Sequence, residues 1–249
     1  MKPRISGHRR AFTLTELMIV IAVIGLVAGL LLPVLARSKS SARQVKCMSN
    51  LRQLAIAADM YWEDNDNATF RYKGANTNNG DVFWFGWLER STGGNEGNRA
   101  YDYTQGPLFP YLENWDVTLC PSFSYHSPKL KLKAKSSTCG YGVNLYLTAP
   151  QLSTVTAIKH PSDMVAFADS AQVNTFQFPA SPSNPMIEEF YYVSTNLLEA
   201  TAHFRHRQKA NVVYCDGHVD REKPQDGSLD THLPEEFVGR LPLECLTVR

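Results

Sequence analysis

The chain has 249 residues, ordinary shares of apolar and charged side chains, and a formal net charge of +1, enough length for one or two domains with a sizeable core. Four of its positive charges precede Phe12, which leaves −3 for the rest of the chain. A protein whose main partner is nucleic acid needs a basic surplus to neutralise phosphates, so this composition argues against that function.

An uncharged, mostly apolar run extends from Leu17 to Ala36. Twenty helical residues rise about 30 Å, the thickness of the hydrocarbon core of a bilayer, so the run predicts a membrane-spanning helix. The basic residues before the run favour a cytoplasmic N-terminus by the positive-inside rule. Further basic residues that follow the run weaken this charge asymmetry: Arg37, Lys39, Arg43 and Lys46. We expect the remainder of the chain to lie outside the cytoplasm.

One carboxylate, Glu16, stands at the start of this apolar run. The segment could be a cleaved secretory signal, a plain anchor, or an anchor with its own processing. A carboxylate at the end of a membrane helix costs free energy and usually marks a function; it could also simply pair with Arg9 or Arg10 at the membrane surface. If the chain were cut between Ala11 and Phe12, the new amino group would lie one helical turn from Glu16, and neighbouring subunits could pair amine with carboxylate.

The basic leader, a small residue, the sequence Phe-Thr-Leu-Thr-Glu-Leu and the apolar helix resemble the class III signal of type IV pilins and type II secretion pseudopilins. The resemblance implies that a prepilin peptidase cuts after Ala11 and methylates the amino group of Phe12, which places Glu16 at mature position five. It also implies a helix kink at Pro33. The family prefers glycine before the cut, where this chain has Ala11.

The helix is predicted to continue beyond the bilayer, because apolar residues recur there at three- and four-residue spacing. These residues are Val45, Met48, Leu51, Leu54, Ala55, Ala58 and Tyr61. We expect one helix from about Thr13 to Trp62, whose second half packs on the rest of the chain. The run from Glu63 to Asn67 should end it. Asp64 and Asp66 in that run could bind calcium, but the glycine and distal glutamate of an EF-hand loop are missing, and a solvated loop is preferred.

Short aromatic runs occupy residues 68 to 118, and the second half of the chain alternates short β-type runs with turns. Trp84 and Trp87 could form a platform on which sugar rings stack. The preferred interpretation is the aromatic core of a small β-rich domain, since Trp and Phe are readily buried.

Asp216-Gly217, between the runs "NVVYC" and "HVD", predicts a β-hairpin with a type I′ turn. His206 precedes Asp216 with nine residues between them. This spacing resembles prepilin-like proteins with a C-terminal His-X9-Asp-Gly domain, numerous in planctomycete and verrucomicrobial lineages. Other stretches agree, including "KCMSNLRQL", "LCPS" and "YGVNLYL", so that the resemblance spans residue 9 to about residue 220.

Cysteine and histidine offer two further hypotheses. The five cysteines are Cys47, Cys120, Cys139, Cys215 and Cys245. Outside the cytoplasm they permit up to two disulfides, and the resemblance implies a Cys47–Cys120 pair, because related sequences tend to carry both surrounding segments. The alternative is that all five are reduced and buried.

A metal site is the less favoured interpretation of the histidine-rich segment. Its candidate ligands are His203, His206, Cys215, Asp216 and His218. Strand alternation sends Cys215 and Asp216 to different sides, and no other His-rich spacing completes a closed shell. We prefer a structural role, in which His206 hydrogen-bonds to the Asp216-Gly217 turn. No metal and no cofactor are expected.

No enzyme motif stands out in the chain. The nearest case uses Asp169, or Glu188 and Glu189, as paired acids of a sugar hydrolase, but adjacent positions on a strand face opposite ways. We therefore expect a protein that is not an enzyme.

Together these inferences predict an α+β, pilin-like fold with a long N-terminal helix packed on a small antiparallel β-rich head. Four segments are expected: a leader at 1–11, a membrane helix at 12–36, an amphipathic helix at 37–66 and a head at 67–249. The expected function is that of an inner-membrane structural subunit of a secretion or pilus-like assembly. Its partners would be prepilin peptidase, other pilin-like subunits, inner-membrane machinery and lipid. The alternative is a membrane-anchored binding protein for polysaccharide or another envelope ligand.

Overall fold

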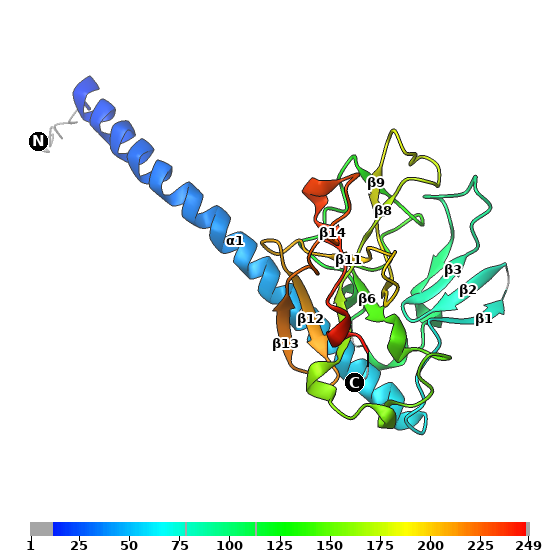
Figure 1. Ribbon diagram of the computed structural model, residues 1–249. Helices are drawn as coiled ribbons and strands as arrows, with labels where there is room; N and C mark the ends of the chain where they lie inside the picture. Colours follow the sequence, from blue (N-terminus) through cyan, green and yellow to red (C-terminus); the bar gives the residue numbers. More distant parts are fainter. Residues whose placement is uncertain (1–11, 78, 113, 248–249) are drawn as a thin grey trace, which may run out of the picture. The chain divides into compact units, whose positions relative to one another are not determined.

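The computed structural model describes residues 12–77, 79–112 and 114–247. The chain divides into two compact units, residues 1–42 and 43–249. One helix, α1 (Leu14–Asp64), begins in the first unit and ends in the second (Figure 1). It passes through Pro33, although a proline inside a helix removes a backbone hydrogen bond. The bounds lie within two residues of the predicted ones.

The second half of α1 contributes one apolar face to the core of the head. Buried residues on it are Cys47, Leu51, Leu54, Ala55, Ala58 and Trp62. They share a hydrophobic cluster with Tyr141, Phe167 and Val213 of the strands. Val45 was predicted on the same face but is 66% exposed; the buried face starts only at Cys47. The helix ends where Asp66 and Asn67 adopt left-handed φ values of 55° and 60°, which these residue types tolerate.

A five-stranded sheet forms the centre of the head (Figure 1). Its order is β10 (Tyr192–Val193), β6 (Tyr141–Asn144), β7 (Val165–Asp169), β12 (Ala210–Tyr214) and β13 (Val219–Glu222). The neighbours pair antiparallel except β10 and β6, which are parallel. Every residue of β6, β7 and β12 is buried. Covered on both faces, these strands need not alternate apolar with polar residues.

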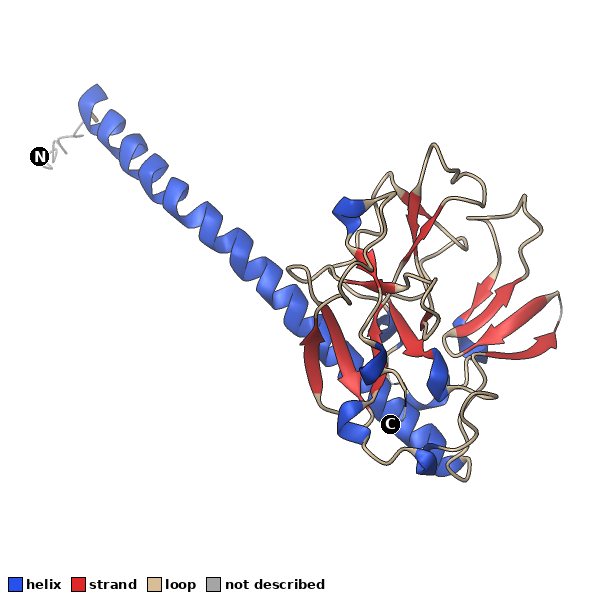
Figure 2. Cartoon of the chain, in the orientation of Figure 1, coloured by secondary structure: helices blue, strands red, loops and turns tan. Residues whose placement is uncertain are grey.

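Smaller sheets surround this centre, joined by long loops (Figure 2). An antiparallel sheet contains β1 (Lys73–Thr77), β2 (Gly80–Phe83), β3 (Gly86–Glu89) and β4 (Tyr101–Asp102). A three-stranded sheet has the order β5 (Leu130–Lys131), β9 (Met186–Glu188) and β8 (Gln172–Asn174), and a pair joins β11 (Ala202–His203) to β14 (Val238–Gly239). The predicted α+β architecture, a long N-terminal helix packed on an antiparallel-rich head, is confirmed.

Short 3-10 helices lie between the strands. They are η1 (Tyr103–Gln105), η2 (Phe109–Tyr111), η3 (Trp115–Thr118), η4 (Leu145–Leu147), η5 (Val155–Ala157), η6 (Pro161–Asp163), η7 (Pro234–Glu236) and η8 (Leu243–Cys245). Helix η3 ends two residues before Cys120, so it delivers that cysteine to the core beside α1. Asn50 of α1 fixes this approach by donating from Nδ2 to the carbonyl oxygen of Leu119 at 2.9 Å.

The predicted hairpin at Asp216-Gly217 exists, and it joins β12 to β13. Its turn type was predicted wrongly. Only Gly217 has a positive φ, at 83°, and its N–H donates to the carbonyl of Tyr214 at 2.9 Å. This is the three-residue loop in which a left-handed glycine closes a bulge, a loop that relieves Asp216 of a positive φ.

A type I′ turn does occur, but nine residues earlier. His206 and Lys209 exchange backbone hydrogen bonds of 3.0 and 3.3 Å, and between them Arg207 and Gln208 have φ values of 56° and 60°. Two non-glycine residues in the left-handed region cost free energy. The chain therefore holds His206 at the base of a strained turn.

Candidate functional site

The apolar part of α1 fits a membrane span. Side chains from Phe12 to Leu35 are exposed, and among the described residues α1 is the helix that is long and apolar enough to cross a bilayer. A helix that leaves such a surface uncovered needs lipid or other subunits around it.

Glu16 has a partner within its own helix. Thr13 donates to its Oε2 from the backbone nitrogen at 2.8 Å and from the hydroxyl at 2.7 Å. In return the backbone N–H of Glu16 donates to Thr13 Oγ1 at 3.2 Å. This reciprocal arrangement is a capping box, the Thr-x-x-Glu signature of a helix start, which our reading of the sequence did not recognise. Both bonds from Thr13 go to Oε2, so Oε1 is left to face other groups.

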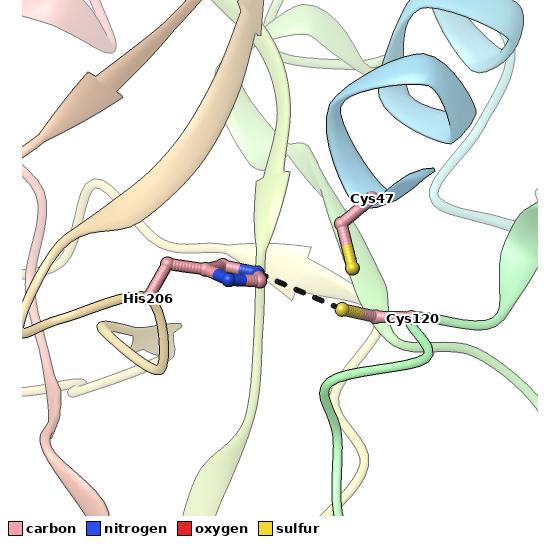
Figure 3. A group of neighbouring side chains, drawn as sticks. All are labelled: Cys47, Cys120 and His206. Atoms are coloured by element: carbon pink, nitrogen blue, oxygen red, sulfur yellow. Dashed lines mark hydrogen bonds between the residues drawn. The ribbon is translucent and has the colours of Figure 1, made fainter. Parts of the chain in front are cut away.

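A second candidate site lies in the core of the head, where three donor side chains converge (Figure 3). Cys47 comes from α1, Cys120 follows η3, and His206 comes from the type I′ turn between β11 and β12. Their sulfur and nitrogen atoms all lie within 4.8 Å of one another. His206 Nε2 is 3.8 Å from Cys120 Sγ, and the Cys47 thiol also donates to Ser122 Oγ at 3.8 Å. All three side chains are buried.

A buried ion pair borders this group, which we call the Cys2His cluster. Asp169, the last residue of β7, has Oδ2 3.3 Å from His206 Nε2 and Oδ1 3.6 Å from Arg205 Nε. Asp169 Oδ2 also accepts a hydrogen bond from the backbone N–H of Asn211 at 2.7 Å. Arg205 donates from Nη2 to the carbonyls of Gly140 and Ser170, both at 2.8 Å. Asp169 Oδ1 is buried and has no hydrogen-bond partner.

The cluster changes the acidity of its members. Burial lowers the pKa of His206, but its hydrogen bonds with Asp169 and Cys120 outweigh burial and raise it to about 9. Burial raises the pKa of Cys120 well above its usual range. The neighbouring Cys120 thiol lowers the pKa of Cys47. The pair thus contains one thiol that ionises more readily than the other.

Residues 7–32 match the family described as the prokaryotic N-terminal methylation motif. The N-terminal segment is similar to that of pilin-like proteins. No solved structure matches the chain.

Curated relatives agree with this motif. The chain is 44% identical over 62 residues to type II secretion system core protein G of Pectobacterium carotovorum, covering 24% of this chain and 40% of that protein. It is 42% identical over 62 residues to the Escherichia coli K12 protein of the same name, covering 25% and 43%. It is 33% identical over 63 residues to the type IV major pilin protein PilA of Myxococcus xanthus, covering 25% and 29%. The chain thus spans less than half the length of each of these relatives.

Several residues predicted at the pilin-like N-terminus lie outside the described part of the chain. These are Ala11 and the basic leader before it, so the cleavage site itself stays a prediction. Phe12, the first described residue, is 74% exposed. Pro33 lies within α1, and its role in assembly also stays a prediction.

The hydrogen-bond partner predicted for His206 is wrong. His206 faces Asp169 and Cys120, not the Asp216-Gly217 turn. Asp216 instead accepts hydrogen bonds within its own loop, from the backbone N–H of His218 at 3.1 Å and from the His218 ring. The reason is topological. The type I′ turn that carries His206 precedes β12, whereas the loop that carries Asp216 follows it. The two residues therefore lie at opposite ends of that strand.

The predicted Cys47–Cys120 disulfide brings together two residues that do lie close, within 4.8 Å at their sulfurs. Both thiols are free in the structure, and the pairing stays a prediction. The sequence predicted a structural role for His206, with a metal ligand as the less favoured alternative, and a Cys47–Cys120 pair, but it did not connect the three residues. Separations of 73 and 86 residues carry no local signal of such a contact.

The remaining predicted sites do not form ligand sites among the described residues. Asp64 Oδ2 accepts a hydrogen bond from the Tyr111 hydroxyl at 3.0 Å, and Asp66 is exposed in the loop that follows. Neither belongs to the group of three converging donors. The loop holding them fits the solvated interpretation.

The alternative in which Trp84 and Trp87 together form a sugar-stacking platform is wrong. Trp84 is fully buried, and its Nε1 donates to the carbonyl of Tyr191 at 2.7 Å. Trp87 is only partly exposed, with its ring packed so closely on Gly80 that a Cβ there would lie 2.2 Å from it. A platform needs both rings open to solvent, and Trp84 instead belongs to the hydrophobic core.

Glu188 and Glu189, the acids of the hydrolase hypothesis, are both buried. Glu188 is surrounded by Lys131 and Lys133, whereas Glu189 accepts hydrogen bonds from the Thr138 backbone N–H at 3.0 Å and from its hydroxyl at 3.0 Å. Burial raises the pKa of Glu189 to about 7. This shift should make the stability of the protein depend on pH.

Because the pKa of Glu189 is higher in the folded than in the unfolded state, folding retains its proton, and its contribution to stability falls as pH rises from about 4.5 through about 7. We expect the free energy of unfolding of Glu189→Gln to fall less than that of the parent protein as pH rises through this window. Urea unfolding of the full chain in detergent at pH values below and above this window measures it. Asp226→Asn, at an exposed acid, is the matched control and should behave as the parent protein; an equal decline in the parent and Glu189→Gln would contradict the prediction.

Proposed function

We propose that this chain is a pseudopilin-like structural subunit of a type II secretion or type IV pilus-like envelope assembly. The observation that carries the proposal is the N-terminal methylation motif over residues 7–32, at the start of a helix whose apolar side chains are uncovered. The 33–44% identity to core protein G and to the type IV major pilin supports it.

In this proposal a prepilin peptidase cuts between Ala11 and Phe12 and methylates the new amino group. The chain then spans the inner membrane once, with the N-terminus on the cytoplasmic side and the head outside. Glu16 binds the amino group of a neighbouring Phe12 through Oε1, which accepts neither of the two hydrogen bonds from Thr13, so the capping box can stay intact. Gly25 and Gly29 leave open space on the helix, where another helix can approach closely.

The resemblance to proteins with a His-X9-Asp-Gly domain concerns the head, and it assigns no activity to the head. The head supplies no stacking platform at Trp84 and Trp87, so no specific observation favours the polysaccharide-binding alternative.

Mass analysis of the N-terminal peptide from protein recovered from its native membrane tests the proposal. We expect a mature chain that starts at N-methylated Phe12. An Ala11→Gly variant, which restores the residue preferred before the cut, is the matched control and should be processed at least as completely. A chain that starts at Met1, or near Arg37, would exclude prepilin processing.

A further inference from the structure

We propose that Cys47, Cys120 and His206 bind one zinc ion in the core of the head. Each residue comes from a different part of the chain, and each points its donor atom at the same small volume (Figure 3). The proposal is independent of the proposed function, since it concerns the head alone.

The donor set and its spacing suit zinc. Two thiolates and one imidazole are ligands that zinc prefers, at about 2.3 Å for sulfur and about 2.0 Å for nitrogen. In a tetrahedral shell these lengths separate sulfur from nitrogen by about 3.5 Å. The observed distance from Cys120 Sγ to His206 Nε2 is 3.8 Å, so these two atoms need to move little to take up the ion, and Cys47 Sγ lies within 4.8 Å of both.

The surroundings supply the charge that the ion requires. Binding requires thiolates at Cys47 and Cys120 and a deprotonated Nε2 at His206, so the protons that these three atoms carry are released to solvent. The two thiolates then cancel the double positive charge of zinc, and the imidazole is neutral. The adjoining Asp169 and Arg205 carry opposite charges and cancel each other. The site is therefore neutral in the metal-bound state, which a buried position favours.

Two further features of the structure are consistent with a bound ion. Asp169 Oδ1 is buried without a hydrogen-bond partner, and the other oxygen of this carboxylate, Oδ2, lies 3.3 Å from His206 Nε2, so the carboxylate adjoins one of the three ligands. The turn that presents His206 is held with two non-glycine residues at positive φ, and such strain is retained where the surrounding structure determines the position of a side chain. A disulfide between the cysteines would use neither feature and would leave His206 Nε2 facing sulfur.

The experiment measures metal content and thiol state in the full chain, purified in detergent from its native membrane without chelators. We expect one zinc ion per chain and free thiols at Cys47 and Cys120. Cys47→Ser and His206→Gln should each lower the zinc content at least tenfold. Cys215→Ser is the matched control, because it removes a cysteine outside the cluster, and it should keep the zinc.

A second measurement covers the case in which these variants do not fold. The wild-type protein is stripped of metal, reduced and titrated with Co²⁺. A tetrahedral thiolate site gives intense visible bands together with a sulfur-to-cobalt charge-transfer band, and Zn²⁺ should abolish both. A spectrum without sulfur charge transfer would overturn the proposal. So would native protein whose Cys47 and Cys120 peptides are disulfide-linked, or an unchanged zinc content in folded Cys47→Ser.

Discussion

Replacing Glu16 by glutamine is expected to abolish assembly while the subunit still inserts in the membrane. Glutamine retains the capping box, because Gln serves at this position as well as Glu, but it removes the negative charge that our proposal pairs with the amino group of a neighbouring Phe12. Hydrogen bonds to charged groups contribute about 1.5–3 kcal/mol, and every 1.4 kcal/mol is roughly a factor of ten. We expect crosslinking between neighbouring subunits in native membranes to fall at least about tenfold.

Thr13→Ala is the matched control for this result. It breaks the capping box, in which Thr13 and Glu16 exchange hydrogen bonds, but it leaves the carboxylate charged. Losing a cap costs about 1 kcal/mol of helix stability, so crosslinking should stay close to that of the parent. If Thr13→Ala abolished crosslinking and Glu16→Gln did not, Glu16 would act as a helix cap and the charge pairing would be wrong.

Replacing Glu188 by alanine is expected to destabilise the head by about 3–5 kcal/mol, the cost of leaving the buried charge of Lys133 without its partner; Lys131 keeps its ion pair with Glu96. Its Oε1 accepts from Lys131 Nζ at 3.3 Å and from Lys133 Nζ, and its Oε2 accepts from Asn174 at 2.6 Å. Glu188 and Lys131 are each 1% exposed. Burial alone would raise the pKa of Glu188, but the two lysines lower it to about 2. Urea unfolding of the full chain in detergent, followed by tryptophan fluorescence, measures the loss.

The head offers a control pair of the same residue types. Lys129 and Glu235 also form an ion pair, but their side chains are 49% and 54% exposed. Exposed pairs contribute about 0–1 kcal/mol, so Glu235→Ala should change stability little. Glu188→Gln, which keeps an oxygen for one lysine, should fall between the two. Equal effects of Glu188→Ala and Glu235→Ala would show that burial does not set the cost of breaking these pairs.

The sequence predicted α1 well because helix formation leaves a local signal. Apolar residues repeat at helical spacing as far as Tyr61, and the Asx-rich run that follows favours turns. The prediction failed at Val45, where spacing alone did not reveal that the buried face begins at Cys47. Periodicity shows that a helix has two faces, and it does not show how far the head covers one of them.

The position of the hairpin was predicted correctly, but its turn type was not. Asp216-Gly217 is compatible both with a two-residue turn and with a longer loop closed by a left-handed glycine, and the pairing register of β12 decides between them. Arg207-Gln208 gave no turn signal, because neither residue type favours a positive φ. The strain at that turn is visible only in the folded chain.

The Cys2His cluster could not be predicted from one sequence. Its residues lie on a helix, after a 3-10 helix and in a turn, and only the packing of α1 on the sheet brings them together. Glu188 and Glu189 illustrate the same limit. Strand alternation predicted that the two side chains face opposite ways, but it did not show that both are buried.

The continuity of α1 also has a mechanical consequence. Residues 43–64 belong to the head and pack in its core, while the same helix extends back toward the membrane segment without a flexible linker. Tension on the chain would therefore reach the head through about six turns of packed helix and through the Asn50 bond to Leu119. To leave the head, this segment would have to give up the core contacts of its buried face. In a fibre that is pushed or pulled, the head should stay folded under loads that would unravel a domain from a loose end.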